Sequence, residues 1–400
     1  MKNTIIPYGV LFLLLLFASC SKENENMEKL TEFLDSVKTE FAPDKRVSIF
    51  NYVLEKTQGN PILKIETNHP AAVEKVNNFL KREKINIDKK FDILPMDDLK
   101  GKTWGIVNVS VANIRSKPKH SAELATQALL GTVVKIYKKK NGWYLVQTPD
   151  DYISWVDDEG IIPVTEKKKN NYLKSKKAIF VNDYGFAYSK PNTKSFRVSD
   201  LVIGNLLKYE GSSGNFIKVK YPDGREGYVP SGQVRIFGEW LKTVKATPES
   251  ILETAKRFHG IPYLWGGTSA KAYDCSGFTK TVYFMNGIIL PRDASQQALV
   301  GEFVDDKINL GKFQPGDLVF FGTKAKNGNK AKVTHVGIYM GNGKYIHEAG
   351  KVKINSFVKT DDNFNQYRYN AFLWAQRILS SQGKNGVKLI KSNNYYRIKK

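Results

Sequence analysis

The chain has 400 residues, 41% of them hydrophobic, and its 62 basic and 39 acidic side chains give a formal net charge of +23. This length allows several domains with their own cores, and the composition excludes a long disordered chain. The charge favours anionic partners, but no nucleic-acid-binding motif is recognisable, so nucleic acid is not an expected partner.

The N-terminus predicts an exported protein. Lys2 precedes an apolar run at residues 5–17, which ends at Ala18-Ser19-Cys20. An apolar core this short is typical of a secretory signal rather than a membrane-spanning helix. Its ending resembles that of bacterial lipoprotein signals, which implies cleavage of residues 1–20 before a lipidated Cys20. The alternatives are an ordinary signal peptide cut nearby and an apolar helix. We expect a membrane-anchored lipoprotein of the cell envelope, in the periplasm or on the cell surface.

Lipidation of Cys20 would determine whether the remaining cysteine can form a disulfide. Cys20 and Cys275 are the two cysteines of the chain. With Cys20 lipidated, Cys275 has no partner for an intramolecular disulfide. An unpaired thiol in an exported protein is either buried and inert or reactive.

Residues 21–100 predict a small α/β segment to which the sequence assigns no chemistry. A polar tether is expected up to about Asn26. Two sets of apolar residues then recur at helical spacing, which indicates amphipathic helices. They are Leu30, Phe33, Leu34 and Val37, and then Val73, Val76, Phe79 and Leu80.

Residues 101–240 contain an internal repeat. Ser116-Lys117-Pro118 recurs as Ser189-Lys190-Pro191, an offset of 73 residues that persists without a gap for about forty residues. Each copy is rich in β-branched and aromatic residues and broken by Gly, Pro and Asp turns, which predicts a small β-barrel built twice. The fragments Asn141-Gly142-Trp143 and Ile153-Ser154-Trp155 resemble bacterial SH3-like domains. We expect one such domain at 101–165 and a second at 172–240.

A further domain is predicted at 246–380, followed by a basic tail at 381–400 without a clear role. Thr247-Pro248-Glu249 is a typical helix start, with an N-cap, a proline and an acidic residue in the first turn. A second helix is expected from Cys275. Strand-like runs follow at 317–321, 333–340, 344–348 and 372–375. Helices followed by an antiparallel sheet predict an α+β domain.

Cys275, His335 and His347 are candidate catalytic residues. At the start of a helix, Cys275 would have its thiolate stabilised by the helix dipole. Strand alternation puts His335 and Gly337 on one face. A three-residue loop at 341–343, or a bulge of equivalent effect, would place His347 opposite Gly337 and diagonal to His335.

This arrangement predicts covalent catalysis. Cys275 would attack a carbonyl, His335 would take and return the proton, and His347 would orient His335. The Cys275 backbone N–H and the Tyr263 hydroxyl are candidate oxyanion donors. A zinc site built from the three triad side chains lacks a fourth ligand. No metal and no cofactor is expected.

Residues 247–379 resemble the NlpC-type family of bacterial cell-wall cysteine peptidases, which have a circularly permuted papain-like fold. The resemblance rests on five short segments and covers most of the domain. They are 263–267, 274–278, 290–293, 315–321 and 335–339, and His347 falls where the third triad member is expected.

Two SH3-like modules before such a domain further resemble the dipeptidyl-peptidase VI branch of this family. That resemblance implies cleavage of stem peptides with a free N-terminal L-Ala, between γ-D-Glu and the diamino acid. It also implies substrate contacts from the catalytic domain and from the first SH3-like module. The residues are Tyr263, Trp265, Asp274, Ser276, Arg292 and Asp293, with Glu123 and Tyr152 of the first SH3-like module closing the substrate end. Ala294 stands where family members often carry a serine.

The expected function is thus a γ-D-glutamyl-diamino acid endopeptidase that recycles peptidoglycan-derived peptides. Its expected partners are these peptides, the cell wall and, through the lipid, a membrane. Three alternatives stay open. They are a wall-remodelling endopeptidase acting on intact peptidoglycan, a non-catalytic wall-binding scaffold, and an amidase or acyltransferase using the same thioester.

Overall fold

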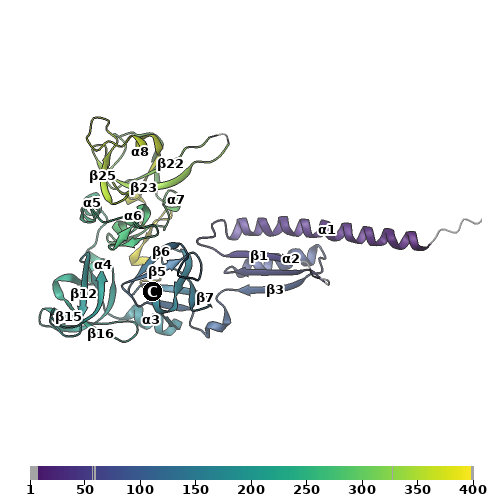
Figure 1. Cartoon of the computed structure of the whole chain (residues 1–400), viewed down its shortest axis with the longest axis horizontal. Coiled ribbons are helices and arrows are strands. Elements are labelled where there is room, and N and C mark those ends of the chain that lie inside the picture. The colour runs from purple at the N-terminus through teal and green to yellow at the C-terminus, as the bar shows by residue number, and fades with distance from the viewer. Residues whose placement is uncertain (1–7, 56, 58–59, 327, 398–400) are drawn as a thin grey trace, which may run out of the picture. The chain divides into compact units, whose positions relative to one another are not determined.

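A computed structural model describes residues 8–397 except 56, 58, 59 and 327, with side chains from Glu25 onward. The chain divides into two compact units, residues 1–96 and 97–400 (Figure 1). The proposed signal sequence and Cys20 lie outside the residues whose side chains are described. Among the described residues, no helix combines the length and apolar character that crossing a membrane requires.

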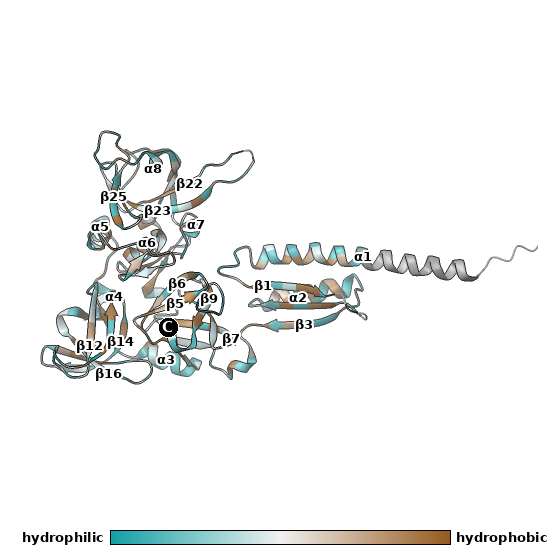
Figure 2. Ribbon diagram, in the orientation of Figure 1, coloured by the Kyte–Doolittle hydropathy of each residue, from teal (hydrophilic) through white to brown (hydrophobic). Residues whose placement is uncertain are grey.

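The first unit is a small α/β layer, as predicted. Its elements are α1 (Tyr8–Phe41), β1 (Phe50–Glu55), β2 (Ile62–Thr67), α2 (Pro70–Arg82) and β3 (Asp88–Ile93). β2 is the central strand, antiparallel to β1 and parallel to β3. Leu30, Leu34 and Val76 are fully buried in the shared core. The described part of α1 alternates between hydrophilic and hydrophobic residues, as an amphipathic helix does (Figure 2). The backbone of residues 21–26, expected as a tether, is helical.

The second unit begins with two seven-stranded antiparallel sheets, each curled round its own core. The first contains β4 (Trp104–Val107), β5 (Val111–Arg115), β6 (Leu124–Leu129), β7 (Val133–Lys140), β8 (Trp143–Gln147), β9 (Ile153–Asp157) and β10 (Ile161–Val164). After α3 (Glu166–Lys174), the second contains β11 (Lys177–Phe180), β12 (Tyr184–Tyr188), β13 (Arg197–Val202), β14 (Leu206–Ser213), β15 (Phe216–Lys220), β16 (Glu226–Pro230) and β17 (Val234–Ile236). The order β10-β4-β7-β8-β9-β5-β6 corresponds strand by strand to β17-β11-β14-β15-β16-β12-β13.

The α+β domain follows α4 (Phe237–Thr243). It contains α5 (Pro248–Arg257), β18 (Thr268–Ser269), β19 (Ala272–Tyr273), α6 (Cys275–Phe284), β20 (Ile288–Ile289), α7 (Ala294–Gln297), β21 (Glu302–Asp305), β22 (Leu318–Thr323), β23 (Lys332–Gly341), β24 (Lys344–Glu348), β25 (Val352–Ser356), α8 (Gln366–Ala371) and β26 (Phe372–Arg377). Its main sheet is antiparallel, in the order β21-β26-β22-β23-β24-β25. One face of this sheet packs on α5 and α6, and the other carries a separate aromatic cluster.

The C-terminal segment is packed rather than free. β27 (Lys388–Leu389) pairs with β20, and Ile390 and Tyr396 are buried. Lys388 contacts Asp151 of the first barrel, and the Asn393 side-chain amide donates to the Pro149 carbonyl at 3.3 Å. The segment for which the sequence offers no role therefore links the α+β domain to the first barrel.

Candidate active site

Cys275 is the first residue of α6, as predicted. Asp274 is the N-cap, and its Oδ1 accepts a hydrogen bond from the Gly277 backbone N–H at 2.7 Å. Aspartate is among the preferred N-caps because its side chain satisfies an amide that has no partner inside the helix. The cap fixes the direction in which the helix begins, and therefore the position of the thiol.

Two glycines permit the close packing around this helix start. A Cβ atom on Gly277 would lie 1.9 Å from the Gly267 carbonyl oxygen, and one on Gly266 would lie 2.2 Å from that of Leu124. Gly266 also has a φ of +81°, which L-residues rarely adopt. The 263–267 motif thus serves to bring α6 and the first barrel into backbone contact.

Asp274 and Arg292 form a buried ion pair behind Cys275. The guanidinium contacts both carboxylate oxygens, at 3.1 and 2.5 Å, and its Nη1 also donates to the Ser276 hydroxyl at 2.9 Å. Their side chains are only 2% and 10% exposed, for Arg292 and Asp274 respectively. Because each group already has charged or polar partners, the arrangement favours a positioning role for the pair. Direct substrate contact by Asp274, Ser276 or Arg292 stays a prediction.

His335 and His347 lie on facing strands in the predicted register. Gly337 pairs with His347 across β23 and β24. The turn itself has two residues, Asn342 and Gly343, with φ values of 51° and 75°, and a register shift at Met340 supplies the equivalent bulge. The diagonal contact follows, with His335 Nε2 2.7 Å from His347 Nδ1.

Asn355 on β25 extends this pair and was not predicted. Its Nδ2 donates to the Asn363 carbonyl at 2.8 Å, which directs its Oδ1 toward His347 Nε2, also at 2.8 Å. Since a carbonyl oxygen only accepts, His347 carries its proton on Nε2 and accepts at Nδ1. His335 must then donate from Nε2, which leaves its Nδ1 unprotonated. No motif marks Asn355, because strand β25 was itself not predicted.

Burial keeps both imidazoles neutral at rest. Desolvation, followed by the neighbouring His347, holds the pKa of His335 well below its ordinary value. Desolvation also lowers the pKa of His347 to about 3, against the hydrogen bond to Asn355. A neutral His335 with a free Nδ1 is the form that a general base requires.

The Cys275 thiol is protonated at rest, although it lies at a helix N-terminus. Burial, and then the charge of Asp274, raises the pKa of the Cys275 thiol to about 12. A hydrogen bond from the Val336 backbone N–H, next to His335, opposes this increase without overcoming it. Desolvation in the closed site therefore outweighs the helix dipole. Proton removal has to accompany the attack of the sulfur on its substrate.

Tyr263 and Trp265 present exposed faces beside the nucleophile. Tyr263 is 38% and Trp265 63% exposed. Burial, and then the charge of Cys275, raises the pKa of Tyr263 to about 12, so its hydroxyl stays protonated and able to donate. Trp265 Nε1 donates to Glu123 Oε1 of the first barrel at 2.7 Å. Glu123, expected at the substrate end of the site, therefore contacts the 263–267 motif.

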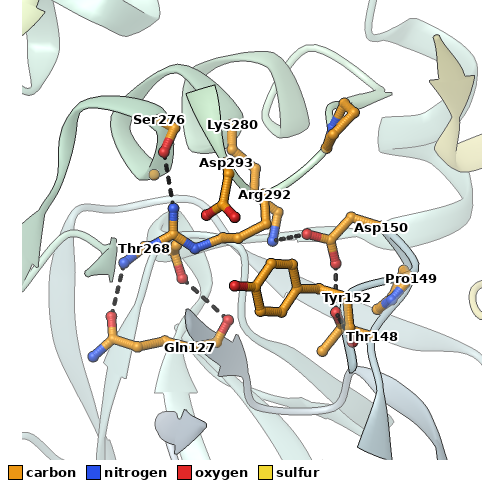
Figure 3. A network of polar contacts seen from close by, with 12 residues as sticks. Gln127, Thr148, Pro149, Asp150, Tyr152, Thr268, Ser276, Lys280, Arg292 and Asp293 are labelled. Atoms are coloured by element: carbon orange, nitrogen blue, oxygen red, sulfur yellow. Dashed lines mark hydrogen bonds and ion pairs between the residues drawn. The ribbon is translucent and has the colours of Figure 1, made fainter. Parts of the chain in front are cut away.

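Further side chains of the first barrel face the α+β domain (Figure 3). Gln127 accepts from the Thr268 backbone N–H at 2.9 Å, and Asp150 pairs with Lys280 at 2.9 Å. Tyr152 points toward Arg292 and Asp293 (Figure 3). Glu123 and Tyr152 are the two barrel residues expected at the substrate end. Each lies near residues of the α+β domain that are also predicted to contact substrate. Within the described part of the chain, no three His, Cys, Asp or Glu side chains converge on a metal-sized site.

Comparisons with known proteins agree with this geometry. Residues 260–375 match the NlpC/P60 family, and residues 114–161 match the bacterial dipeptidyl-peptidase Sh3 domain. A gamma-D-glutamyl-L-lysine dipeptidyl-peptidase of Bacillus cereus is 31% identical over 238 residues, which is 56% of this chain and 67% of the relative. The chain belongs to the NlpC/P60 family.

Two further proteins extend the likeness over the barrels. Dipeptidyl-peptidase 6 of Lysinibacillus sphaericus is 27% identical over 63% of this chain and 90% of its own. The crystal structure of an NlpC/P60 family protein from Bacillus cereus shares the fold, with a TM-score of 0.58 at 24% identity, over 69% of this chain and 99% of that one. The predicted NlpC/P60 domain, preceded by an SH3-like domain, is confirmed.

Proposed function

We propose that this NlpC/P60 protein is a cysteine peptidase that cleaves the γ-D-glutamyl-diamino acid bond of peptidoglycan-derived peptides with a free N-terminal L-Ala. One observation carries the proposal. The hydrogen-bonded series Asn355–His347–His335 leaves an unprotonated ring nitrogen on His335, and the backbone of the next residue, Val336, lowers the pKa of the Cys275 thiol, against the larger effect of burial. The names of the two relatives support the class of bond and the removal of a dipeptide.

The chemistry follows from the tautomers. A substrate carbonyl approaches Cys275, His335 Nδ1 takes the thiol proton, and the sulfur bonds to the carbonyl carbon. The Cys275 backbone N–H and the Tyr263 hydroxyl donate to the oxyanion. The carbon–nitrogen bond then breaks as His335 returns the proton to the leaving amine. Water, deprotonated by His335, hydrolyses the thioester and frees the enzyme.

Charge at the first barrel supports recognition of a free amine. Glu123 lies against Trp265, and Tyr152 points toward Asp293 (Figure 3). Carboxylates and a phenol are groups that bind an ammonium, and an N-acylated peptide would lack that ammonium. This end of the site therefore favours short, released peptides over intact wall.

Two substrates test the proposal. The full chain in detergent is mixed with L-Ala-γ-D-Glu-meso-diaminopimelate and with the same peptide acetylated on Ala, and release of the diamino acid is followed. We expect cleavage of the free peptide alone, and none by C275A. Equal cleavage of both would identify a wall-remodelling endopeptidase instead. Cleavage of neither would favour a scaffold or another acyl-transfer reaction.

We also propose that the protein is exported and lipidated at Cys20. The support is the sequence of residues 2–20 and the substrate, which occurs in the envelope. Expression with radiolabelled palmitate should label the wild type and leave C20A unlabelled. Equal labelling of the two, or none of either, would contradict the anchor without affecting the proposed chemistry.

A further inference from the structure

Arg368 on α8 lies over Phe321, whose ring neighbours that of His335, although no sequence motif includes it. The Asn365 side chain caps this helix and accepts from the Arg368 backbone N–H at 2.9 Å. Two residues earlier, the Asn363 carbonyl holds Asn355, which in turn holds His347. The same short segment therefore positions both the triad and Arg368.

The guanidinium of Arg368 has no counter-ion within the described part of the chain. The three other arginines of residues 247–379 each form an ion pair, Arg257 with Asp183, Arg292 with Asp274 and Arg377 with Asp317. Arg368 instead lies over aromatic rings, 5.7 Å from the centre of Phe321 and 5.3 Å from that of Tyr367. The Phe321 ring is itself 5.7 Å from the ring of His335.

Electrostatics place this charge within reach of the reacting groups. The positive charge of Arg368 contributes to the lowered pKa of both His335 and His347. Burial lowers the pKa of Arg368 itself. A half-buried cation without a partner is costly, and an anion that arrives with the substrate would remove that cost.

The reaction brings such an anion to this place. His335 returns its proton to the nitrogen of the leaving amino acid. The α-carboxylate of that amino acid is attached to the carbon that bears this nitrogen. It therefore lies within a few ångströms of His335 whenever the bond is positioned for cleavage, on the opposite side of the bond from the L-Ala end.

We propose that Arg368 binds the free α-carboxylate of the leaving diamino acid and so selects peptides that end at this residue. This inference rests on the proposed function. A planar guanidinium matches a carboxylate bidentately, and an amide in its place offers a single neutral acceptor. A stem peptide extended beyond the diamino acid carries an amide there, so Arg368 would favour tripeptides over longer stems.

The test compares L-Ala-γ-D-Glu-L-Lys with its C-terminal amide, using the full chain in detergent. We expect the wild type to prefer the free acid in kcat/KM by on the order of 10- to 100-fold. R368Q should reduce this ratio to within about 2-fold, by losing activity on the acid while cleaving the amide about as well as the wild type. Activity on the amide also shows that the R368Q variant is folded.

Two lysines provide matched controls. Lys359 is exposed and lies over Tyr369, which is on α8 with Arg368. K359Q should therefore keep the wild-type ratio of kcat/KM for the acid to that for the amide. Lys353 faces His347 across the β24–β25 pair, so K353Q separates a general effect of charge from a specific contact. Loss of the preference in K353Q but not in R368Q would overturn the assignment.

The other outcomes are also decisive. A wild type that cleaves acid and amide equally, or an R368Q that slows both alike, would overturn the role of Arg368 and leave the proposed function standing. A wild type that cleaves neither peptide would overturn the proposed function, and this inference with it.

Discussion

The two barrels share one backbone plan but have different surroundings. Every strand of the first barrel has its counterpart 73 residues later, from β4 and β11 to β9 and β16, and the strand order is the same. The turns agree as well, since Gly131 and its counterpart Gly204 both have positive φ values. Among the described residues, the first barrel and not the second supplies side chains to the candidate active site.

Two of three corresponding positions differ between the barrels, and the third holds the same residue in different surroundings. Glu123, which contacts Trp265, corresponds to Phe196, a side chain that is 88% exposed. Tyr152 beside Arg292 corresponds to Arg225, whose guanidinium contacts Asp223 and the Asn108 carbonyl of the first barrel. Asp150 corresponds to Asp223. The two barrels thus share a fold, and differences at a few positions determine which barrel lines the candidate active site.

The largest expected effect is on the contact between the first barrel and the α+β domain. Asp150 is 1% exposed and pairs with Lys280, which is 17% exposed. Burial raises the pKa of Asp150, but the charge of Lys280 and the hydrogen bonds from Thr148 and Lys280 together lower it overall. D150A would leave a largely buried ammonium unpaired, which costs about 3–5 kcal/mol of unfolding free energy. Urea titration should show this loss.

The matched variant is D223A in the second barrel. Asp223 is 25% exposed and Arg225 is 41% exposed, so solvent already screens this pair. We expect a loss of about 1 kcal/mol or less. Equal losses of unfolding free energy in D150A and D223A would show that the two ion pairs stabilise the protein alike. That result would contradict the proposed difference between the barrels. In the wild type, the contribution of Asp150 should be lost as pH falls below its ordinary value of 3.8, because its folded pKa is depressed.

Glu123 tests the difference at the substrate end. E123Q keeps an oxygen that can accept from Trp265 and removes only the negative charge. If Glu123 binds the free amine, kcat/KM for the tripeptide should fall by about 10- to 100-fold. Kinetics on the acetylated peptide should change little. F196Q is the corresponding change in the second barrel and should leave both substrates unaffected. A fall of equal size in E123Q and F196Q would contradict the assignment of Glu123.

The repeat and the histidine register could be predicted because they depend on local patterns. The offset of 73 residues is visible in Ser116-Lys117-Pro118 and its copy, and strand alternation with a three-residue loop or an equivalent bulge predicts that the two histidines meet. Asn355 and Arg368 were missed because β25 and α8 are short elements without a marked periodicity. The pairing of β20 with β27 joins residues about a hundred positions apart, and no local signal encodes it.

The depth at which Cys275 is buried could not be predicted, for a different reason. The sequence places Cys275 at a helix N-terminus, which favours a thiolate, but it does not show how deeply the sulfur is buried. Burial depends on how the 263–267 segment, β23 and the first barrel come together, and it reverses the expected direction of the pKa.

The hydroxyl of Tyr152 gives a further test of the difference between the two barrels. Y152F removes the polar atom that points toward Asp293 and keeps the ring (Figure 3). We expect a fall of roughly 5- to 10-fold in kcat/KM for the free peptide, consistent with one lost hydrogen bond of about 1 kcal/mol. R225Q in the second barrel should leave kcat/KM unchanged. An unchanged KM and kcat in Y152F would remove this residue from the substrate end.

The smallest effect concerns a buried carboxylate that, unlike Asp150, has no partner. Glu348 is fully buried, and neither of its oxygens has a hydrogen-bond partner among the described residues. Burial raises its pKa from 4.5 to about 8. The unfolded chain loses this proton first, so stability should fall as pH rises from about 4.5 to 8. E348Q cannot ionise. Its Tm should equal that of the wild type near pH 4.5 and exceed it by roughly 2–4 °C at pH 8.5. A constant difference between the two proteins across this range would show that Glu348 is ionised throughout, with a partner that solvent or the substrate supplies.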